Sequence, residues 1–261
     1  MRDSIGLLTI DNPPRNCLAD PDFLEIDDLM RWISDPALKG IIVTGTGRHF
    51  SAGADLDALG KLARDHGRLL SGMRRGKEIL SCLERAEVPT VAAIEGACFG
   101  GGLEIALACH IRVCGETSIF AFPEVNHGLV PGMGGTVRLP ALSGLGRAMH
   151  MILGGDTIDA ERARSMQLVD YIAPSRKVLN FSFELMKKMV DGRTVEVVRS
   201  VVRSLNNALV MDIAEAMESE TRIFCDLARK LFGDDPAGAG NGKASGEDAI
   251  DHERTAEMGN R

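Results

Sequence analysis

The chain has 261 residues, of which 44% are hydrophobic and only 4% aromatic, and its formal net charge is −7. This length is enough for one large domain whose core is filled mainly by aliphatic side chains. The acidic balance argues against a nucleic-acid-binding protein that works through bulk positive charge. No apolar stretch is long enough to cross a membrane and no signal peptide is recognisable, so we expect a cytoplasmic protein without membrane contact.

The first part of the chain alternates short apolar runs, typical of buried strands, with segments of helical periodicity. Strands are predicted over 5–10, 40–45, 89–94, 111–114 and 118–120, and helices over 23–33, 56–86 and 103–109. Short apolar strands that alternate with helices are typical of α/β proteins with parallel sheets. The sequence therefore predicts an α/β core.

From Gly144 onward the strand signal fades, and helices are predicted over 142–153, 159–166, 178–190, 195–209 and 213–231. The stretch after Gly233 is rich in glycine and poor in apolar residues, which predicts a disordered tail. The predicted organisation is a core over residues 1–190, a helical region over 191–232 and a tail over 233–261.

The cysteines form no CxxC pair, and most of them lie in apolar runs: Cys17, Cys82, Cys98, Cys109, Cys114 and Cys225. We expect free, buried thiols in a reducing compartment rather than disulfides. The spacing of His and Cys residues that is typical of metal ligands is absent, so no metal site is expected.

A triple glycine, Gly100-Gly101-Gly102, follows one buried strand and opens a helix that carries Glu104. The first N–H groups of a helix lack internal partners and lie at its positive end, where a developing oxyanion is stabilised. Without a side chain, Gly101 lets a carbonyl oxygen approach its N–H, and Glu104 lies about one turn further on. The alternative is close helix–strand packing with Glu104 on the surface.

A second turn from strand to helix contains Ser51-Ala52-Gly53-Ala54-Asp55. An oxyanion hole needs two donors aimed at one point, and Ala54 offers a second N–H. The alternative is an ordinary loop in which Asp55 caps the following helix.

Glu124 follows Pro123 and precedes a loop that is polar at its start and glycine-rich at its end. Two nearby carboxylates can share the proton transfers of water addition, one as the acid and the other as the base. The alternative for Glu124 is a salt-bridged surface carboxylate. His127 in the same loop is a candidate proton carrier, with a solvated loop histidine as its alternative.

Together these three elements resemble the crotonase (enoyl-CoA hydratase/isomerase) superfamily, over about residues 5–174. The segments 131–136, 160–163 and 168–169 carry the same resemblance. It implies a ββα spiral core and assigns 191–232 to helical trimerisation, so a homotrimer or homohexamer is expected. It aligns Ala54 and Gly101 with the two oxyanion N–H groups and Glu104 and Glu124 with the paired glutamates of hydratases. The substrate contacts it implies are Ala52, Ala54, Asp55, Leu56, Gly101, Pro131 and Gly132.

The resemblance implies an enoyl-CoA hydratase of fatty acid metabolism that adds water to a 2-enoyl-CoA or removes it from a 3-hydroxyacyl-CoA. Coenzyme A is part of that substrate, and no further cofactor is expected. The alternatives are a double-bond isomerase that uses one glutamate, a dehydratase of carrier-protein-bound acyl chains, and an RNA-binding or inactive assembly subunit. His110 departs from the family, whose members commonly have Asp there, and the assignment of acid and base stays open.

Overall fold

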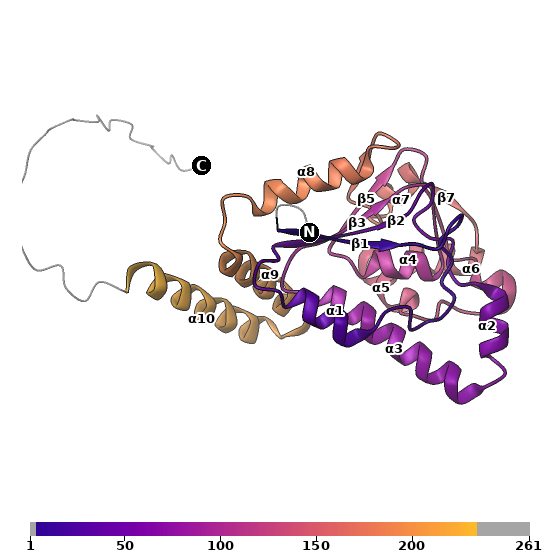
Figure 1. Cartoon of the computed structure of the whole chain (residues 1–261), viewed down its shortest axis with the longest axis horizontal. Coiled ribbons are helices and arrows are strands. Elements are labelled where there is room, and N and C mark those ends of the chain that lie inside the picture. Colours follow the sequence, from indigo (N-terminus) through magenta and orange to yellow (C-terminus); the bar gives the residue numbers. More distant parts are fainter. Residues whose placement is uncertain (1–3, 234–261) are drawn as a thin grey trace, which may run out of the picture. The chain divides into compact units, whose positions relative to one another are not determined.

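The structure is a computed structural model that describes residues 4–233 (Figure 1). The chain divides into two compact units, residues 1–223 and residues 224–261. Both sheets and the predicted site residues belong to the first unit. The predicted tail lies, except for Gly233, outside the described residues.

The main sheet has five strands in the order β1-β2-β3-β5-β8, and every neighbouring pair is parallel. Its strands are β1 (Ile5–Ile10), β2 (Gly40–Gly45), β3 (Thr90–Ile94), β5 (Ile111–Gly115) and β8 (Tyr171–Ala173). The parallel α/β prediction is confirmed. The sequence missed β8, because three residues are too short to show a periodic pattern.

A smaller sheet is formed by β4 (Ala97–Phe99), β6 (Ile119–Ala121) and β7 (Ile158–Asp159). The pair β4–β6 is parallel, whereas β6–β7 is antiparallel. Only two residues separate the end of β3 from the start of β4, and one of them, Gly96, has φ +57°. The chain therefore passes directly from the large sheet to the small one.

The helices are α1 (Ile26–Ile33), α2 (Leu56–Leu62), α3 (His66–Glu84), α4 (Gly101–Leu107), α5 (Gly135–Ser143), α6 (Leu145–Gly154), α7 (Ala160–Ser165), α8 (Val178–Val190), α9 (Val195–Val210) and α10 (Ile213–Phe232), with a 3₁₀ turn η1 (Pro123–His127). The single helix predicted over 56–86 is two helices, because Asp65 caps a new one by accepting the Arg68 N–H. The helix predicted over 142–153 is likewise wrong at Gly144, whose φ of +81° ends one helix before the next begins.

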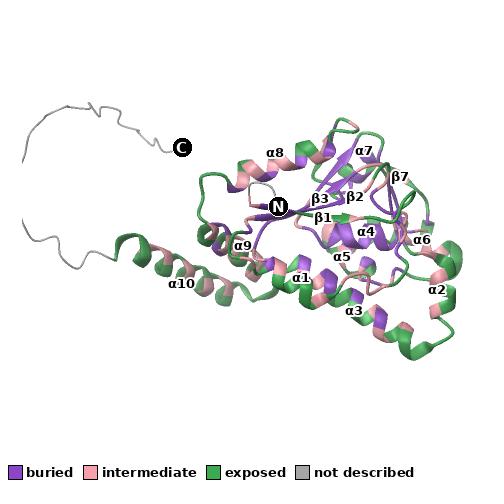
Figure 2. Ribbon diagram, in the orientation of Figure 1, coloured by how far each residue is buried: buried purple, intermediate pink, exposed green. Residues whose placement is uncertain are grey.

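Two groups of buried side chains cover the two faces of the main sheet. Figure 2 colours β2 and β3 largely as buried. Consecutive residues of β2 alternate between them, with Ile41 and Val43 in one group and Ile42 in the other. Alternation of this kind follows from the two-residue period of a strand. Helix α8 packs on the face that carries Ile42, and helices α1, α3 and α4 contribute to the other group.

His110 joins the main sheet to α9. Its Nδ1 accepts the backbone N–H of Thr90 at 3.0 Å, and its Nε2 lies 3.2 Å from Oδ1 of Asn206. This arrangement fits a neutral ring whose proton is on Nε2. Burial lowers the pKa of His110 and supports the same state. His110, where the sequence departs from the family, therefore serves to pack α9 on the sheet. It contacts neither predicted glutamate.

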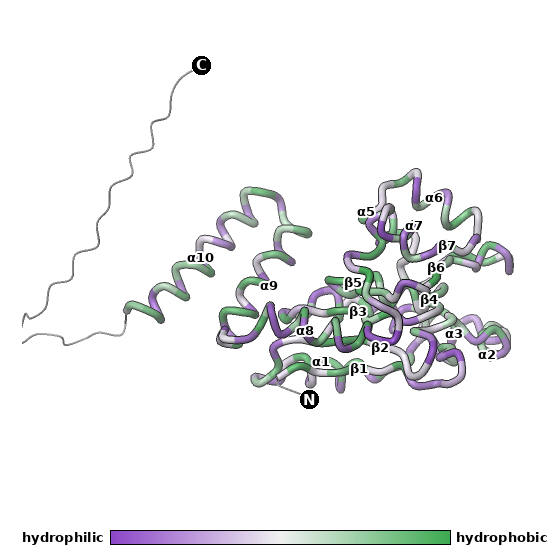
Figure 3. Tube along the Cα trace, turned by 90° about the horizontal axis from the view of Figure 1, so that it is seen from above, coloured by the Kyte–Doolittle hydropathy of each residue, from purple (hydrophilic) through white to green (hydrophobic). Residues whose placement is uncertain are grey.

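Helices α9 and α10 alternate between hydrophobic and hydrophilic residues along their length (Figure 3). Val198 of α9 belongs to the group of buried side chains that also contains residues of α8. Helix α9 therefore packs on the core. Other apolar residues there are exposed, among them Leu205, Leu209 and Ile213. The oligomerisation role of 191–232 stays a prediction.

The thiols of all six cysteines are free. Cys98, Cys109 and Cys114 are buried, and burial raises the pKa of each thiol. Cys17 and Cys82 are only partly buried, and the prediction of buried thiols is wrong for Cys225, which lies exposed on α10. Between residues 4 and 233 no helix is both long and apolar enough to cross a bilayer.

Candidate active site

Both predicted glutamates line one cavity of about 230 Å³ in the first unit. Glu104 comes from α4 and Glu124 from η1, and Ala54 and Gly101 line the same cavity. The structure therefore brings together the four residues that the sequence suggested for the chemistry, although they lie on three separate segments.

Close packing between glycines and Ser51 holds the two segments with the N–H donors together. A Cβ atom on Gly102 would lie 2.6 Å from Cβ of Ser51, so only glycine allows this approach. A Cβ on Gly53 would lie 2.9 Å from the Phe99 carbonyl oxygen and 3.5 Å from the Gly101 nitrogen. The Phe99 N–H also donates to the Ser51 carbonyl at 2.9 Å. The start of α4 consequently lies against the Ser51–Ala54 turn.

The backbone N–H groups of Ala54 and Gly101 are available to a ligand. Within residues 4–233, neither group donates a hydrogen bond. Gly101 is the first residue of α4, so its N–H has no acceptor inside the helix. On either side of Ala54 the backbone is engaged, because the Gly53 carbonyl accepts the Leu18 N–H and the Asp55 N–H donates to Leu18. An oxyanion hole needs two unpaired donors on one cavity, and this role of Ala54 and Gly101 stays a prediction.

Glu104 is only 2% exposed and is held by two backbone donors. The N–H groups of Met133 and Gly135 both donate to its Oε1 at 2.7 Å. Burial raises the pKa of Glu104, whereas these two hydrogen bonds act in the opposite direction. A carboxylate that receives two N–H donors is stabilised in its charged form. The net effect is a raised pKa, because burial outweighs the two N–H donors.

Glu124 has a different environment. Its Oε2 is buried without a hydrogen-bond partner among the described residues. Burial, with a smaller contribution from the charge of Glu104, raises the pKa of Glu124 to about 7. An unpaired carboxyl oxygen in a buried site favours the neutral form. The pKa of both glutamates is raised, and Glu124 is the one for which it reaches about 7, so Glu124 is largely protonated below that pH.

The other predicted contact residues fall in different places. Gly132 lines the cavity that holds both glutamates, whereas Ala52 and Leu56 line a smaller neighbouring cavity. Asp55 caps α2 by accepting the N–H groups of Asp57 and Ala58, as its structural alternative predicted. Pro131 lines a cavity between α3 and α5. Asp55 and Pro131 are therefore not among the residues that surround the glutamates.

The apolar walls of the site were not predicted. They come from the segment after β1, from α2 and α3 and from the loop before α5: Leu18, Ala19, Pro21, Leu59, Leu69, Met73, Leu129, Val130 and Met133. The glycines at 132–135 gave a signal for this loop, but nothing in the sequence indicated that its N–H groups reach Glu104. The walls suit an aliphatic chain next to the two carboxyl groups.

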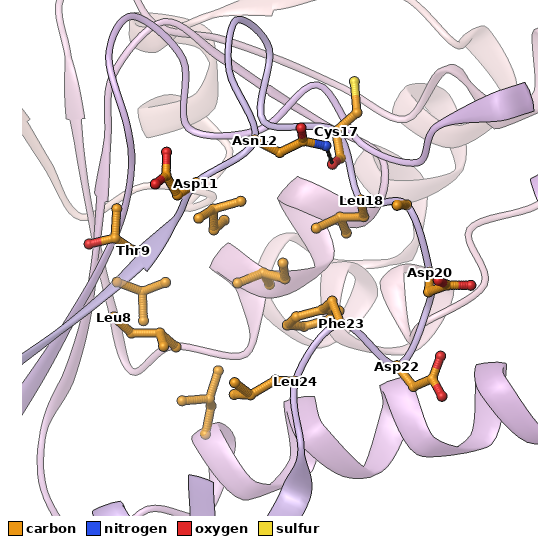
Figure 4. A pocket seen from close by; sticks show the side chains of 15 residues that line it. Leu8, Thr9, Asp11, Asn12, Cys17, Leu18, Asp20, Asp22, Phe23 and Leu24 are labelled. Atoms are coloured by element: carbon orange, nitrogen blue, oxygen red, sulfur yellow. Dashed lines mark hydrogen bonds between the residues drawn. The ribbon is translucent and has the colours of Figure 1, made fainter. Parts of the chain in front are cut away.

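The cavity that holds the glutamates is not the largest one. A cavity of about 530 Å³ lies between the end of β1 and the segment from Cys17 to Leu24 (Figure 4). Helix α1 begins at Ile26, three residues later than predicted, and Phe23 and Leu24 line this space instead of a helix face. Its rim carries Asp11, Asp20 and Asp22, and neither glutamate reaches it. The predicted catalytic residues therefore line the smaller cavity and not this one.

Metal ligation has no candidate among residues 4–233, where no group of three or more His, Cys, Asp or Glu side chains is arranged to hold an ion. That the protein needs no metal stays a prediction.

Comparison with known proteins identifies the family to which the chain is similar. The family model described as enoyl-CoA hydratase/isomerase matches residues 1–232. A glyoxysomal fatty acid beta-oxidation multifunctional protein from Cucumis sativus is 36% identical over 229 residues, which are 87% of this chain and 30% of that protein. A probable enoyl-CoA hydratase from Bacillus subtilis is 38% identical over 166 residues, covering 63% of this chain and 64% of that protein.

The crystal structure of an enoyl-CoA hydratase from Bacillus anthracis is similar over 88% of this chain and 90% of that chain, with 26% identity and a TM-score of 0.80. The fold is therefore the crotonase-like one that the sequence predicted. The chain spans less than two thirds of the length of these curated relatives.

Proposed function

Because the chain belongs to the enoyl-CoA hydratase/isomerase family, we propose that it adds water to a 2-enoyl-CoA thioester, or removes water from the corresponding 3-hydroxyacyl-CoA. The observation that carries this proposal is the pair of glutamates on one cavity with two unpaired N–H donors. An isomerase can carry one proton between two carbons with a single carboxyl group, whereas hydration takes a proton from water and gives a proton to Cα, which two carboxyl groups can share.

The two N–H groups of Ala54 and Gly101 bind the thioester oxygen. Attack on Cβ places negative charge on this oxygen, and donors fixed by the backbone stabilise that charge without having to reorient. Removal of one such donor costs an enzyme about 10² to 10³ in turnover. The glycine at 101 leaves room for the oxygen, since no side chain covers its N–H.

Glu104 is the base and Glu124 is the acid in the direction of hydration. Glu104 takes a proton from the water as its oxygen bonds to Cβ, and Glu124 delivers its proton to Cα as the enolate collapses. This assignment rests on the two N–H donors to Glu104 and on the unpaired oxygen of Glu124. The pKa of Glu124, raised to about 7, keeps most of this group protonated at the start when the pH is below neutral. In dehydration the roles reverse.

The proposal extends to substrate, partners and compartment. The apolar walls around the glutamates support an aliphatic acyl chain. The thioester group comes with the substrate, so we propose no further cofactor and no metal. Exposed apolar residues on α9 and α10, such as Leu205 and Ile213, support a homotrimer or homohexamer. Six free thiols support a reducing compartment such as the cytoplasm.

The test is an assay with 2-enoyl-CoA esters of increasing chain length, followed by loss of the conjugated enoyl absorbance. A parallel assay with 3-enoyl-CoA esters measures isomerisation. Hydration that is faster than isomerisation and falls in both Glu104→Gln and Glu124→Gln supports the proposal. Full isomerase activity in a variant that lacks one of the two glutamates would instead favour the single-carboxyl alternative.

A further inference from the structure

A second, smaller cavity of about 100 Å³ lies next to Glu124. It shares Ala54, Leu59, Glu124 and Leu129 with the cavity described above, and it is additionally lined by His127. His127 ends η1 and is exposed, so this cavity connects the carboxyl group to a titratable side chain at the surface.

The small cavity is large enough for water. One water molecule occupies roughly 30 Å³ of liquid volume. Gly100 also lines this cavity, and a Cβ there would lie 2.7 Å from Oε1 of Glu124. The absence of a side chain at Gly100 thus leaves the carboxyl group open on this side. A water in this cavity would bond the carboxyl group at Oε1, the oxygen of Glu124 that lies nearest to Gly100.

The proposed reaction leaves the two glutamates in the wrong protonation states after every turnover. Glu104 has gained a proton from water, and Glu124 has lost one to Cα. Before the next turnover Glu104 must lose its proton and Glu124 must regain one. The product still occupies the space between them, so a route that reaches Glu124 from its other side shortens this step.

We infer that His127 relays a proton from solvent to Glu124 through water in the small cavity. The inference rests on the proposed hydration. The protonated imidazole of His127 gives a proton to a bridging water, which passes one of its own to the carboxylate of Glu124. His127 then takes a proton from a buffer acid, and Glu104 releases its proton to the water that replaces the product. One proton enters and one leaves, with no other change.

The experiment compares His127→Ala with the unaltered chain, and His66→Ala serves as a matched control because His66 is also an exposed histidine. Steady-state kcat is measured at one pH in dilute buffer, with and without added imidazole. We expect kcat of His127→Ala to fall by about 10²-fold, the low end for loss of a proton-transfer group. KM should change little, and imidazole should restore most of kcat. His66→Ala should behave like the unaltered chain.

A single-turnover measurement with enzyme in excess separates the relay from a structural role. At pH 6 most of Glu124 starts protonated, so the first turnover of His127→Ala should be as fast as that of the unaltered chain. Normal steady-state kcat in His127→Ala would overturn the relay alone. A slow first turnover, or a low kcat that imidazole does not restore, would also overturn it in favour of packing. Absence of hydration in the unaltered chain would overturn the proposed function and the relay together.

Discussion

Substitution of Glu104 by glutamine tests the division of roles between the two glutamates. Glutamine has the shape of glutamate, and its carbonyl oxygen can accept the Met133 and Gly135 N–H groups that now bind Oε1. The loop before α5 should therefore keep its position, and the circular dichroism spectrum and melting temperature should change little. What is lost is the negative charge that accepts the proton of water.

The expected loss in turnover is about 10²- to 10⁴-fold, the usual effect of removing a general acid or base. This range corresponds to about 3 to 5 kcal/mol in the activation free energy. A second effect follows from electrostatics. The charge of Glu104 contributes to the raised pKa of Glu124, so its removal should lower that pKa below about 7. Because burial is the larger cause, the pKa should stay above the ordinary value of 4.5.

The assay is the pH dependence of kcat/KM for hydration. In the unaltered chain, activity should fall as pH rises through about 7, since Glu124 then loses the proton that it must deliver. In Glu104→Gln the remaining activity should fall at a lower pH. Near-normal activity of this variant, or an alkaline limb that stays in place, would refute the assignment of Glu104 as the base and the coupling between the two groups.

Three further predictions follow from the same geometry. Glu124→Gln should stabilise the protein by about 1 to 2 kcal/mol at pH 8, allowing for solvent screening, and not at pH 4. The reason is that a folded-state pKa raised to about 7 contributes stability at low pH that is lost as pH rises through it; urea unfolding at both pH values measures this, and equal effects would contradict it. Gly101→Val should lower kcat/KM by about 10² to 10³. The fold should be retained, because a Cβ there would lie 2.9 Å from Met133 Cε, which is the end of a flexible side chain that can move. Normal turnover in the folded variant would rule out this N–H as a donor. Leu205→Glu, at an exposed apolar position of α9, should reduce the mass in light scattering to that of the monomer, and an unchanged mass would place the interface elsewhere.

Elements with a long or fully buried pattern could be predicted from the sequence. The predictions for 40–45 and 178–190 coincide with β2 and α8. The pattern was strong in both, as a continuous apolar strand in one and thirteen residues of helical periodicity in the other. Where an element is short or interrupted, the pattern fails. Helix α5 was missed because glycine at its start and Pro140 inside it are typical of loops.

The candidate residues were predictable from turns, but their environment was not. The triple glycine and the Ser51–Asp55 turn indicated where N–H donors lie, because these positions depend on local geometry. The hydrogen bonds to Glu104 come from residues 29 and 31 positions away, so they depend on how the whole chain folds. The difference between the two glutamates is a difference in burial and partners, which the sequence alone does not contain.

The three glycines that open α4 have a consequence for how this protein can vary. A side chain has a different effect at each position: Gly100 has φ +48° and lies against Glu124, a side chain at Gly101 would displace the flexible end of Met133 and cover the N–H donor, and Gly102 packs on Ser51. No second-site change compensates for all three, because the obstructing neighbours belong to separate segments. In a library that samples every substitution along the chain, we expect all three positions to tolerate few replacements. The open glycines at 47, 60 and 146 should accept replacements more readily where φ allows. The start of α4 is thus the part of the site that is least free to diverge when the substrate pocket around it changes.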